Sequence, residues 1–203
     1  YKRQTDNYSV SGERSFTDYT TADFAARRKT YLQIVTDLLV KDLSDLNSTW
    51  AAGGSYRTTF EALDVDVALT NILNGIGFIS NGEIALERID PAIDEGQENE
   101  HSCFSDNTNQ DMWANVYGIH NIIIGSYTSE SGAIVSGVSL IELVNQSDIT
   151  IGAALGAKAN TTISKLDNLL ALGITFDDII SSETLGSNGA AGQLSSALKA
   201  QGT

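Results

Sequence analysis

Side chains that could take part in chemistry are concentrated between Gly82 and Thr108. This stretch contains a closely spaced triplet of charged residues, Glu83, Glu87 and Arg88, together with one of the two histidines and the single cysteine of the chain. Carboxylates, an imidazole, a thiol and several hydroxyl groups in one short tract are more than packing requires. The tract is therefore the first candidate for a functional site.

Glu83 and Glu87 are four residues apart on a predicted helix, so their carboxylates should lie on one face of it. With an imidazole from a facing segment, for which His101 is the candidate, such a pair can hold a hard or borderline metal ion. Glu83, Glu87 and His101 are accordingly the predicted metal ligands. The alternative is an exposed helix face on which Arg88 pairs with one of the glutamates, an interaction worth less than about 1 kcal/mol.

Residues 100–108 are rich in polar side chains and precede a predicted helix. Their hydroxyl, amide and carboxylate groups fit two interpretations, N-terminal capping of that helix and the floor of a polar pocket. Because one cap needs few of these groups, a pocket is predicted as well. Its predicted lining is Glu83, Glu87, Arg88, Glu100, His101, Ser102, Ser105, Asp106, Asn107 and Thr108.

Two further reactive side chains have simpler explanations. Cys103 has no recognisable base partner, and we predict that it is a small buried side chain beside Phe104 that serves packing. His120 is followed by isoleucine at positions 123 and 124, where a helical metal motif would need a second ligand. We therefore predict that His120 lies in the core or at its boundary.

The chain of 203 residues carries a net charge of −14, which argues against nucleic acid or an anionic membrane as partner. A solvated acidic surface explains most of this charge, and the charge fits an extracytoplasmic protein. No run of about 18 apolar residues occurs, so no membrane span is predicted. Four Asn-x-Ser/Thr sequons give weak support for secretion. The chain opens in a polar segment and closes just after a helical pattern, so we expect it to be part of a longer protein.

Helical periodicity of apolar residues dominates the chain, and strand-like alternation is nearly absent. The predicted fold class is all-α, an antiparallel helix bundle. Residues 1–20 lack periodicity and are predicted to be a loop or linker, and residues 21–203 to be one bundle domain. Thr21 is the predicted start of the first helix, and Pro91 is predicted to end the second. The predicted helices span residues 21–48, 56–63, 64–89, 108–124, 139–145, 148–172, 176–182 and 189–200, with a Ser/Gly loop at 126–137.

Several of these motifs resemble the imelysin-like family. The most specific is Glu-His-Ser-Cys-Phe-Ser-Asp-Asn-Thr at residues 100–108, followed by Asp111 and by Gly118-Ile119 with Asn121. The pairs Gly82-Glu83 and Glu87-Arg88, and the helical residues 22–40, are similar to the branch called iron-regulated protein A. The similarity is close over residues 13–125 and looser in the remainder.

The resemblance implies a bacterial protein of the periplasm or the cell surface, made of two helical bundles of which this chain supplies the second. It implies a role in iron uptake, with iron or a small iron chelate as ligand, or another divalent metal. The N-terminal bundle of the same protein is the implied partner.

Two rival functions stay open. One is a metallopeptidase, because the family has a GxHxxE metal motif just upstream of the part that resembles residues 1–19. Residues 118–120 look like a degenerate copy of that motif, with Ile123 in the place of the glutamate, so the resemblance assigns no metal to His120. The other rival is a structural or adhesive surface module.

Overall fold

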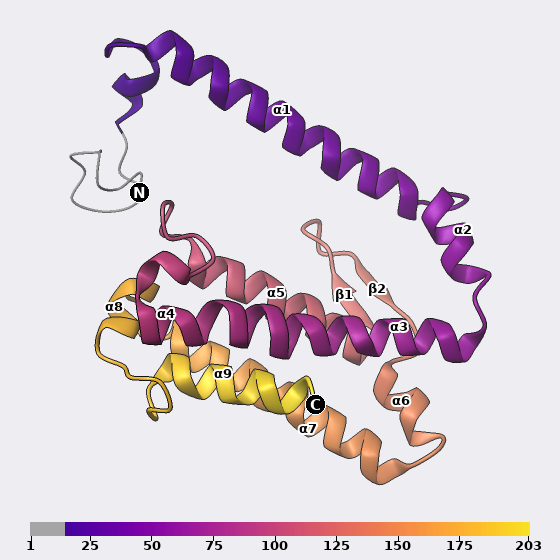
Figure 1. The fold of residues 1–203 in the computed structure, drawn as a ribbon. Coiled ribbons are helices and arrows are strands. Elements are labelled where there is room, and N and C mark those ends of the chain that lie inside the picture. Colours follow the sequence, from indigo (N-terminus) through magenta and orange to yellow (C-terminus); the bar gives the residue numbers. More distant parts are fainter. Residues whose placement is uncertain (1–14) are drawn as a thin grey trace. The chain divides into compact units, whose positions relative to one another are not determined.

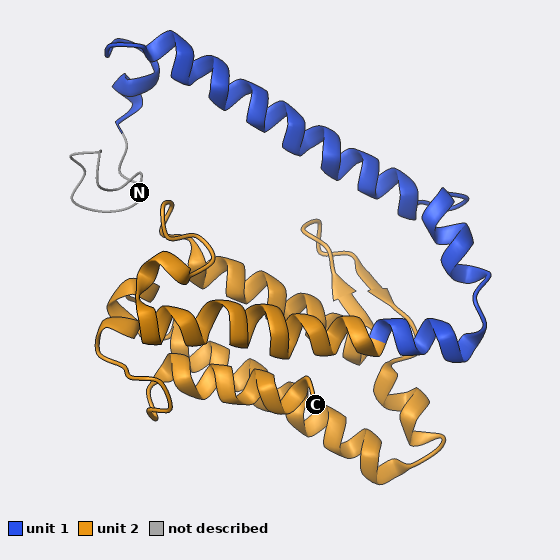
Figure 2. Cartoon of the chain, in the orientation of Figure 1, with its two compact units in different colours: residues 1–72 blue, residues 73–203 orange. Residues whose placement is uncertain are grey.

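The computed structural model of the protein describes residues 15–203. The chain divides into two compact units, residues 1–72 and 73–203, and unit 1 is described from residue 15 onward (Figure 2). Most of the predicted N-terminal loop, residues 1–20, lies outside the described residues, and its last part forms the short 3-10 helix η1, Phe16–Tyr19. Unit 1 also contains α1 (Ala25–Trp50), α2 (Ser55–Glu61) and the start of α3 (Val65–Gly77).

The long first helix is present, but its start and its burial differ from the prediction. It begins at Ala25 rather than at Thr21, because the backbone of Phe24 has a left-handed conformation (φ 60°) that a continuous helix excludes. Its apolar side chains, Tyr31 and Leu38 among them, are exposed in the structure. The periodicity thus predicted the helix correctly but says nothing of what covers its apolar face.

The second long helix consists of three segments with two kinds of hydrogen-bonded turn. It starts as α3, continues as a π-helix, η2 (Phe78–Ile89), and ends as α4 (Asp90–Glu95). The prediction that Pro91 stops the helix at Ile89 is wrong. Pro91 lies in the first turn of α4, directly after η2, and the helix continues through it to Glu95.

The rest of unit 2 is helical apart from one hairpin. Two three-residue strands, β1 (Ser126–Thr128) and β2 (Ile134–Ser136), pair in antiparallel fashion with Tyr127 opposite Val135, within the predicted loop. The helices are η3 (Gln97–Asn99), α5 (Thr108–Ile124), α6 (Leu140–Asn145), α7 (Ile149–Leu170), α8 (Phe176–Ser181) and α9 (Ala190–Gln201). The all-α prediction is confirmed, and the structure is a helix bundle.

The core of unit 2 lies between η2, α5, α7 and α9. Helix α9 packs against both η2 and α7, and α7 also packs against α5 (Figure 1). Side chains from all four elements are completely buried at this junction; they include Ile84, Met112, Ile123, Leu166, Leu194 and Leu198. Where α9 ends, a Cβ atom on Gly77 would come within 3.1 Å of the Gly202 carbonyl oxygen. Glycine at position 77 therefore permits a close approach of the two segments.

Gly125 closes α5 in a backbone conformation that favours glycine. Its φ is +64°, and a Cβ atom there would lie 2.9 Å from the Gly137 carbonyl oxygen and from Ser139 Cα. We expect Gly125→Ala to lower the free energy of unfolding by about 2–4 kcal/mol, from left-handed strain and from backbone crowding. Urea unfolding followed by circular dichroism measures this loss.

Gly118→Ala is the matched control for this prediction, because it lies on the same helix and a Cβ atom there meets nothing within 4 Å among the described residues. It should stabilise the protein by up to about 1 kcal/mol through helix propensity. Equal effects of the two substitutions would contradict the prediction.

Candidate functional site

The π-helix η2 brings Glu83 and Arg88 together. Arg88 donates from Nε and from Nη2 to the same carboxylate oxygen, Glu83 Oε1, at 3.0 and 2.9 Å. The two residues are five positions apart, the spacing of hydrogen-bonded residues in a π-helix, and π-helical turns are frequent at functional sites. Glu87 is exposed on the same element. The alternative prediction, an ion pair between Arg88 and one of the glutamates, is thus formed with Glu83. This ion pair occupies the Glu83 carboxylate, which is also one of the predicted metal ligands.

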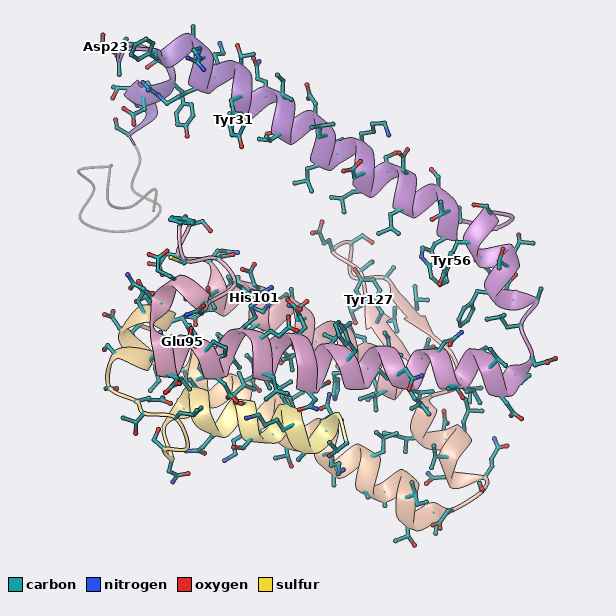
Figure 3. The ribbon with its side chains drawn as sticks, viewed as in Figure 1. Asp23, Tyr31, Tyr56, Glu95, His101 and Tyr127 are labelled. Atoms are coloured by element: carbon teal, nitrogen blue, oxygen red, sulfur yellow. The ribbon has the colours of Figure 1, made fainter. Side chains whose placement is uncertain are left out.

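His101 comes from the segment between α4 and α5 (Figure 3). Burial lowers the pKa of His101, and the positive charge of Arg88 lowers it further, while Asp111 and Glu83 act in the opposite direction. The imidazole is therefore neutral at pH 7. Its Nδ1 atom is buried and has no hydrogen-bond partner among the described residues. A neutral imidazole with an unused buried nitrogen is suited to bind a ligand.

Hydrogen bonds within residues 102–111 fix the backbone around His101. The Ser102 N–H group donates to Thr108 Oγ1 at 3.0 Å, and the Ser102 hydroxyl donates to Asp111. Asn107 Nδ2 donates to the other oxygen of Asp111 at 3.0 Å. Asn107 takes the N-cap position of α5 without a side-chain capping bond, so the predicted capping role of these residues is replaced by bonds that close the segment on itself.

Glu100 is the most unusual carboxyl group of this segment. It is 5% exposed, and neither of its carboxyl oxygens has a hydrogen-bond donor with normal geometry among residues 15–203. Burial raises its pKa to about 8, helped by the neighbouring carboxyl group of Asp177 in α8, whereas the Thr108 hydroxyl partly offsets the shift. Asp177 is absent from the predicted site. The sequence gives no signal for Asp177, because it is far from Glu100 along the chain and acidic residues are common in the first turn of a helix.

A pocket of about 440 Å³ opens on this segment. Four of its lining residues belong to the predicted pocket: Glu100, His101, Ser102 and Ser105. The structure adds Glu98, Cys103 and Phe104 to the lining. Cys103 is buried, as predicted, at 4% exposure, while Phe104 is exposed.

The remaining predicted pocket residues have other positions. Glu83 and Arg88 act on His101 electrostatically from η2, and Asp106 acts in the same way on Glu100. Asn107 is exposed, and Thr108 is buried beside the segment. The predicted pocket is therefore assembled in part, around His101 rather than around the two glutamates of η2.

The predicted metal ligands do not form a metal centre by themselves. Within residues 15–203, no group of three or more His, Cys, Asp or Glu side chains is arranged to hold a metal ion. His101 and Glu100 supply donors of suitable type, so any metal bound here needs ligands from elsewhere. His120, half-buried with its ring centroid 6.4 Å from that of Tyr117, lies at the core boundary as predicted.

In the part that the structure describes, no single helix is long and apolar enough to cross a membrane. One bent pair of helices, Ala25–Glu61 with Val65–Glu95, reaches the required length and composition together.

Comparison with known proteins gives the chain its family. No curated protein gives a significant match to the chain. The imelysin family model matches residues 4–201, almost the whole sequence, and the chain therefore belongs to the imelysin family.

Proposed function

We propose that this chain is the second helical bundle of an extracytoplasmic imelysin protein that binds iron, or a small iron chelate, for uptake. Membership of the imelysin family supports the proposal at the family level. The similarity of residues 100–108 to the iron-regulated protein A branch supports the finer assignment. The periplasm or the cell surface is the proposed location, and the net charge of −14 is compatible with it.

The observation that carries the proposal is the pair of unsatisfied polar groups at one pocket. Glu100 and His101 are neighbours, both line the pocket, and each has buried polar atoms without a partner among the described residues. Such groups cost free energy in a folded protein unless a ligand, an ion or water satisfies them. Carboxylate oxygen and imidazole nitrogen are donors that iron accepts.

Two further features of the site are part of the proposal. The ligands that the described residues lack would come from the N-terminal bundle that the family resemblance implies. Arg88 would hold Glu83 in place while the pocket is empty, and an arriving cation would compete with the guanidinium group for that carboxylate. The metal is cargo in this proposal, and the pocket needs to release it as well as bind it.

Titration of the full-length protein with ferric ion and with a ferric chelate, followed by calorimetry, tests the proposal. We expect His101→Ala to weaken binding at least tenfold, because it removes the imidazole nitrogen. We expect Glu83→Ala to weaken binding at least tenfold as well, because it removes the carboxylate that pairs with Arg88 and that an arriving cation would contact. Glu87→Gln is the matched control, since Glu87 lies on the same helix but is exposed, and it should leave the affinity unchanged. Unchanged binding in both alanine variants would overturn the proposal. Metal-dependent cleavage of a peptide would favour the metallopeptidase instead.

A further inference from the structure

Three ring side chains follow one another along one face of α5. Trp113, Tyr117 and His120 are spaced four and three residues apart, as neighbours on one side of an α-helix are. The ring centroids of Trp113 and Tyr117 are 5.1 Å apart, and those of Tyr117 and His120 are 6.4 Å apart. Trp113 is 45% exposed, and the other two side chains are half-buried. The rings therefore form a continuous row that solvent can reach.

A carboxylate from the neighbouring helix stands beside this row. The Tyr117 hydroxyl donates to Asp167 Oδ1 on α7 at 3.3 Å, and α7 packs against α5. Burial raises the pKa of Tyr117, and the negative charge of Asp167 raises it further. Asp167 is exposed and takes part in no ion pair within the part of the chain that the structure describes. Its neighbours on the helix surface, at positions 163, 164, 170 and 171, are uncharged.

The surroundings of the row offer no positive charge that would neutralise Asp167. Helix α5 contains neither Lys nor Arg, and its one acidic residue is Asp111. Of the two lysines in α7, Lys165 donates to Gln193 on α9 at 2.7 Å. Lys158 is nine residues from Asp167, which places it on the opposite side of the helix. The row thus combines aromatic faces with an uncompensated carboxylate.

We propose that Trp113, Tyr117 and Asp167 form a docking surface for an arginine side chain of a partner protein. The face of an aromatic ring attracts a cation through its quadrupole, and Trp does so most strongly. A guanidinium group can stack flat on a ring while it donates two parallel N–H groups to a carboxylate. An ammonium group is a compact, strongly hydrated charge, so lysine should bind here less well. Nucleic acids and anionic membranes are unsuited to this surface, because they carry the same sign of charge as Asp167.

This docking surface is separate from the proposed iron pocket. None of its three residues lines that pocket, and none is a predicted metal ligand. The proposal therefore does not depend on iron binding. The partner it requires is a protein whose contact segment exposes arginine.

The test is a calorimetric titration of the full-length protein with a short peptide that carries two arginines between glycines. Salt at about 0.15 M screens long-range attraction to the acidic chain. The arginine peptide should bind saturably. A peptide with lysine at the same positions should bind several-fold more weakly, and so should one with citrulline, the uncharged isostere of arginine. Trp113→Ala and Asp167→Asn should each weaken binding of the arginine peptide about tenfold.

Two control variants match these substitutions. Trp50→Ala removes another indole that is 45% exposed, on α1. Asp94→Asn removes one exposed negative charge from α4. Neither should change the affinity for the arginine peptide.

Three results would overturn the proposal: no saturable binding of the arginine peptide, equal binding of the three peptides, or equal losses in Asp167→Asn and Asp94→Asn. Circular dichroism checks that the variants fold. Because Trp113 and Asp167 are both exposed and lie on different helices, either variant keeps the test valid if the other does not fold.

Discussion

The thermal unfolding midpoint should fall as the pH rises from about 7 to about 9, and Glu100→Gln should remove most of that fall. The reason is the pKa of Glu100, which burial and Asp177 raise from 4.5 to about 8 in the folded protein. Between these two values the folded state holds a proton that the unfolded state has lost. The stabilisation is therefore complete below the unfolded pKa and disappears as the pH passes the folded pKa.

His101 has the opposite influence, and the pH range separates the two groups. Its pKa is lowered from 6.5 in the folded protein, so its contribution to stability increases as the pH rises toward that value. Above about pH 7 it is largely neutral in both states, and Glu100 dominates the comparison. Differential scanning fluorimetry at several pH values measures the effect, with Glu98→Gln as control. A midpoint that falls equally with pH in the Glu100→Gln variant would contradict the prediction.

Asp90→Ala should reduce the free energy of unfolding by about 2–4 kcal/mol. Asp90 Oδ1 accepts a hydrogen bond from Ser195 Oγ at 2.5 Å, and Asp90 Oδ2 forms an ion pair with Lys199. Ser195 is 2% exposed, so its hydroxyl would lose its partner in a buried position. Lys199 is more exposed, at 36% for its side chain, so water would recover part of the lost interaction.

Urea unfolding followed by circular dichroism measures this loss. Asp94→Ala provides the control on the same short helix, because Asp94 is exposed. Asp90→Asn should cost less than Asp90→Ala, since its amide oxygen still accepts the Ser195 hydrogen bond. Similar unfolding midpoints for Asp90→Ala and Asp94→Ala would show that the contact between α4 and α9 contributes little.

The helices were well predicted from the sequence, because apolar residues at helical spacing mark one face of a helix whatever segment packs against that face. Residues 108–124 were predicted exactly as α5 has them, and 148–172 nearly as α7 has them. The π-helical stretch could not be predicted in this way, because apolar spacing indicates a helix without showing where its turns widen. The prediction for Pro91 is wrong because a proline disfavours a continuing helix without forbidding it.

The candidate site was predictable in its local part alone. Residues 100–108 are predicted to form a pocket segment because so many polar groups follow one another there, and the structure places a pocket on residues 100–105 of that segment. The link between Glu100 and Asp177 joins segments that are distant in sequence, and it carries no periodic pattern. The predicted pairing of Glu83 with Glu87 is an error of another kind, because the structure pairs Glu83 with Arg88 instead. Four-residue spacing puts two side chains on one face of an α-helix, but η2 is a π-helix, and its pairing follows five-residue spacing.

The contacts of α9 with η2 and α4 have a consequence for how this protein folds. Ser195, Lys199 and Gln201 bond to residues that precede them by 105, 109 and 121 positions. During synthesis, the stretch around Asp90 therefore emerges long before the helix that completes its packing. Contacts of such long sequence separation form slowly, because the intervening chain must be closed into a loop first. The nascent chain should accordingly stay incompletely folded, and open to chaperones, until α9 has been made.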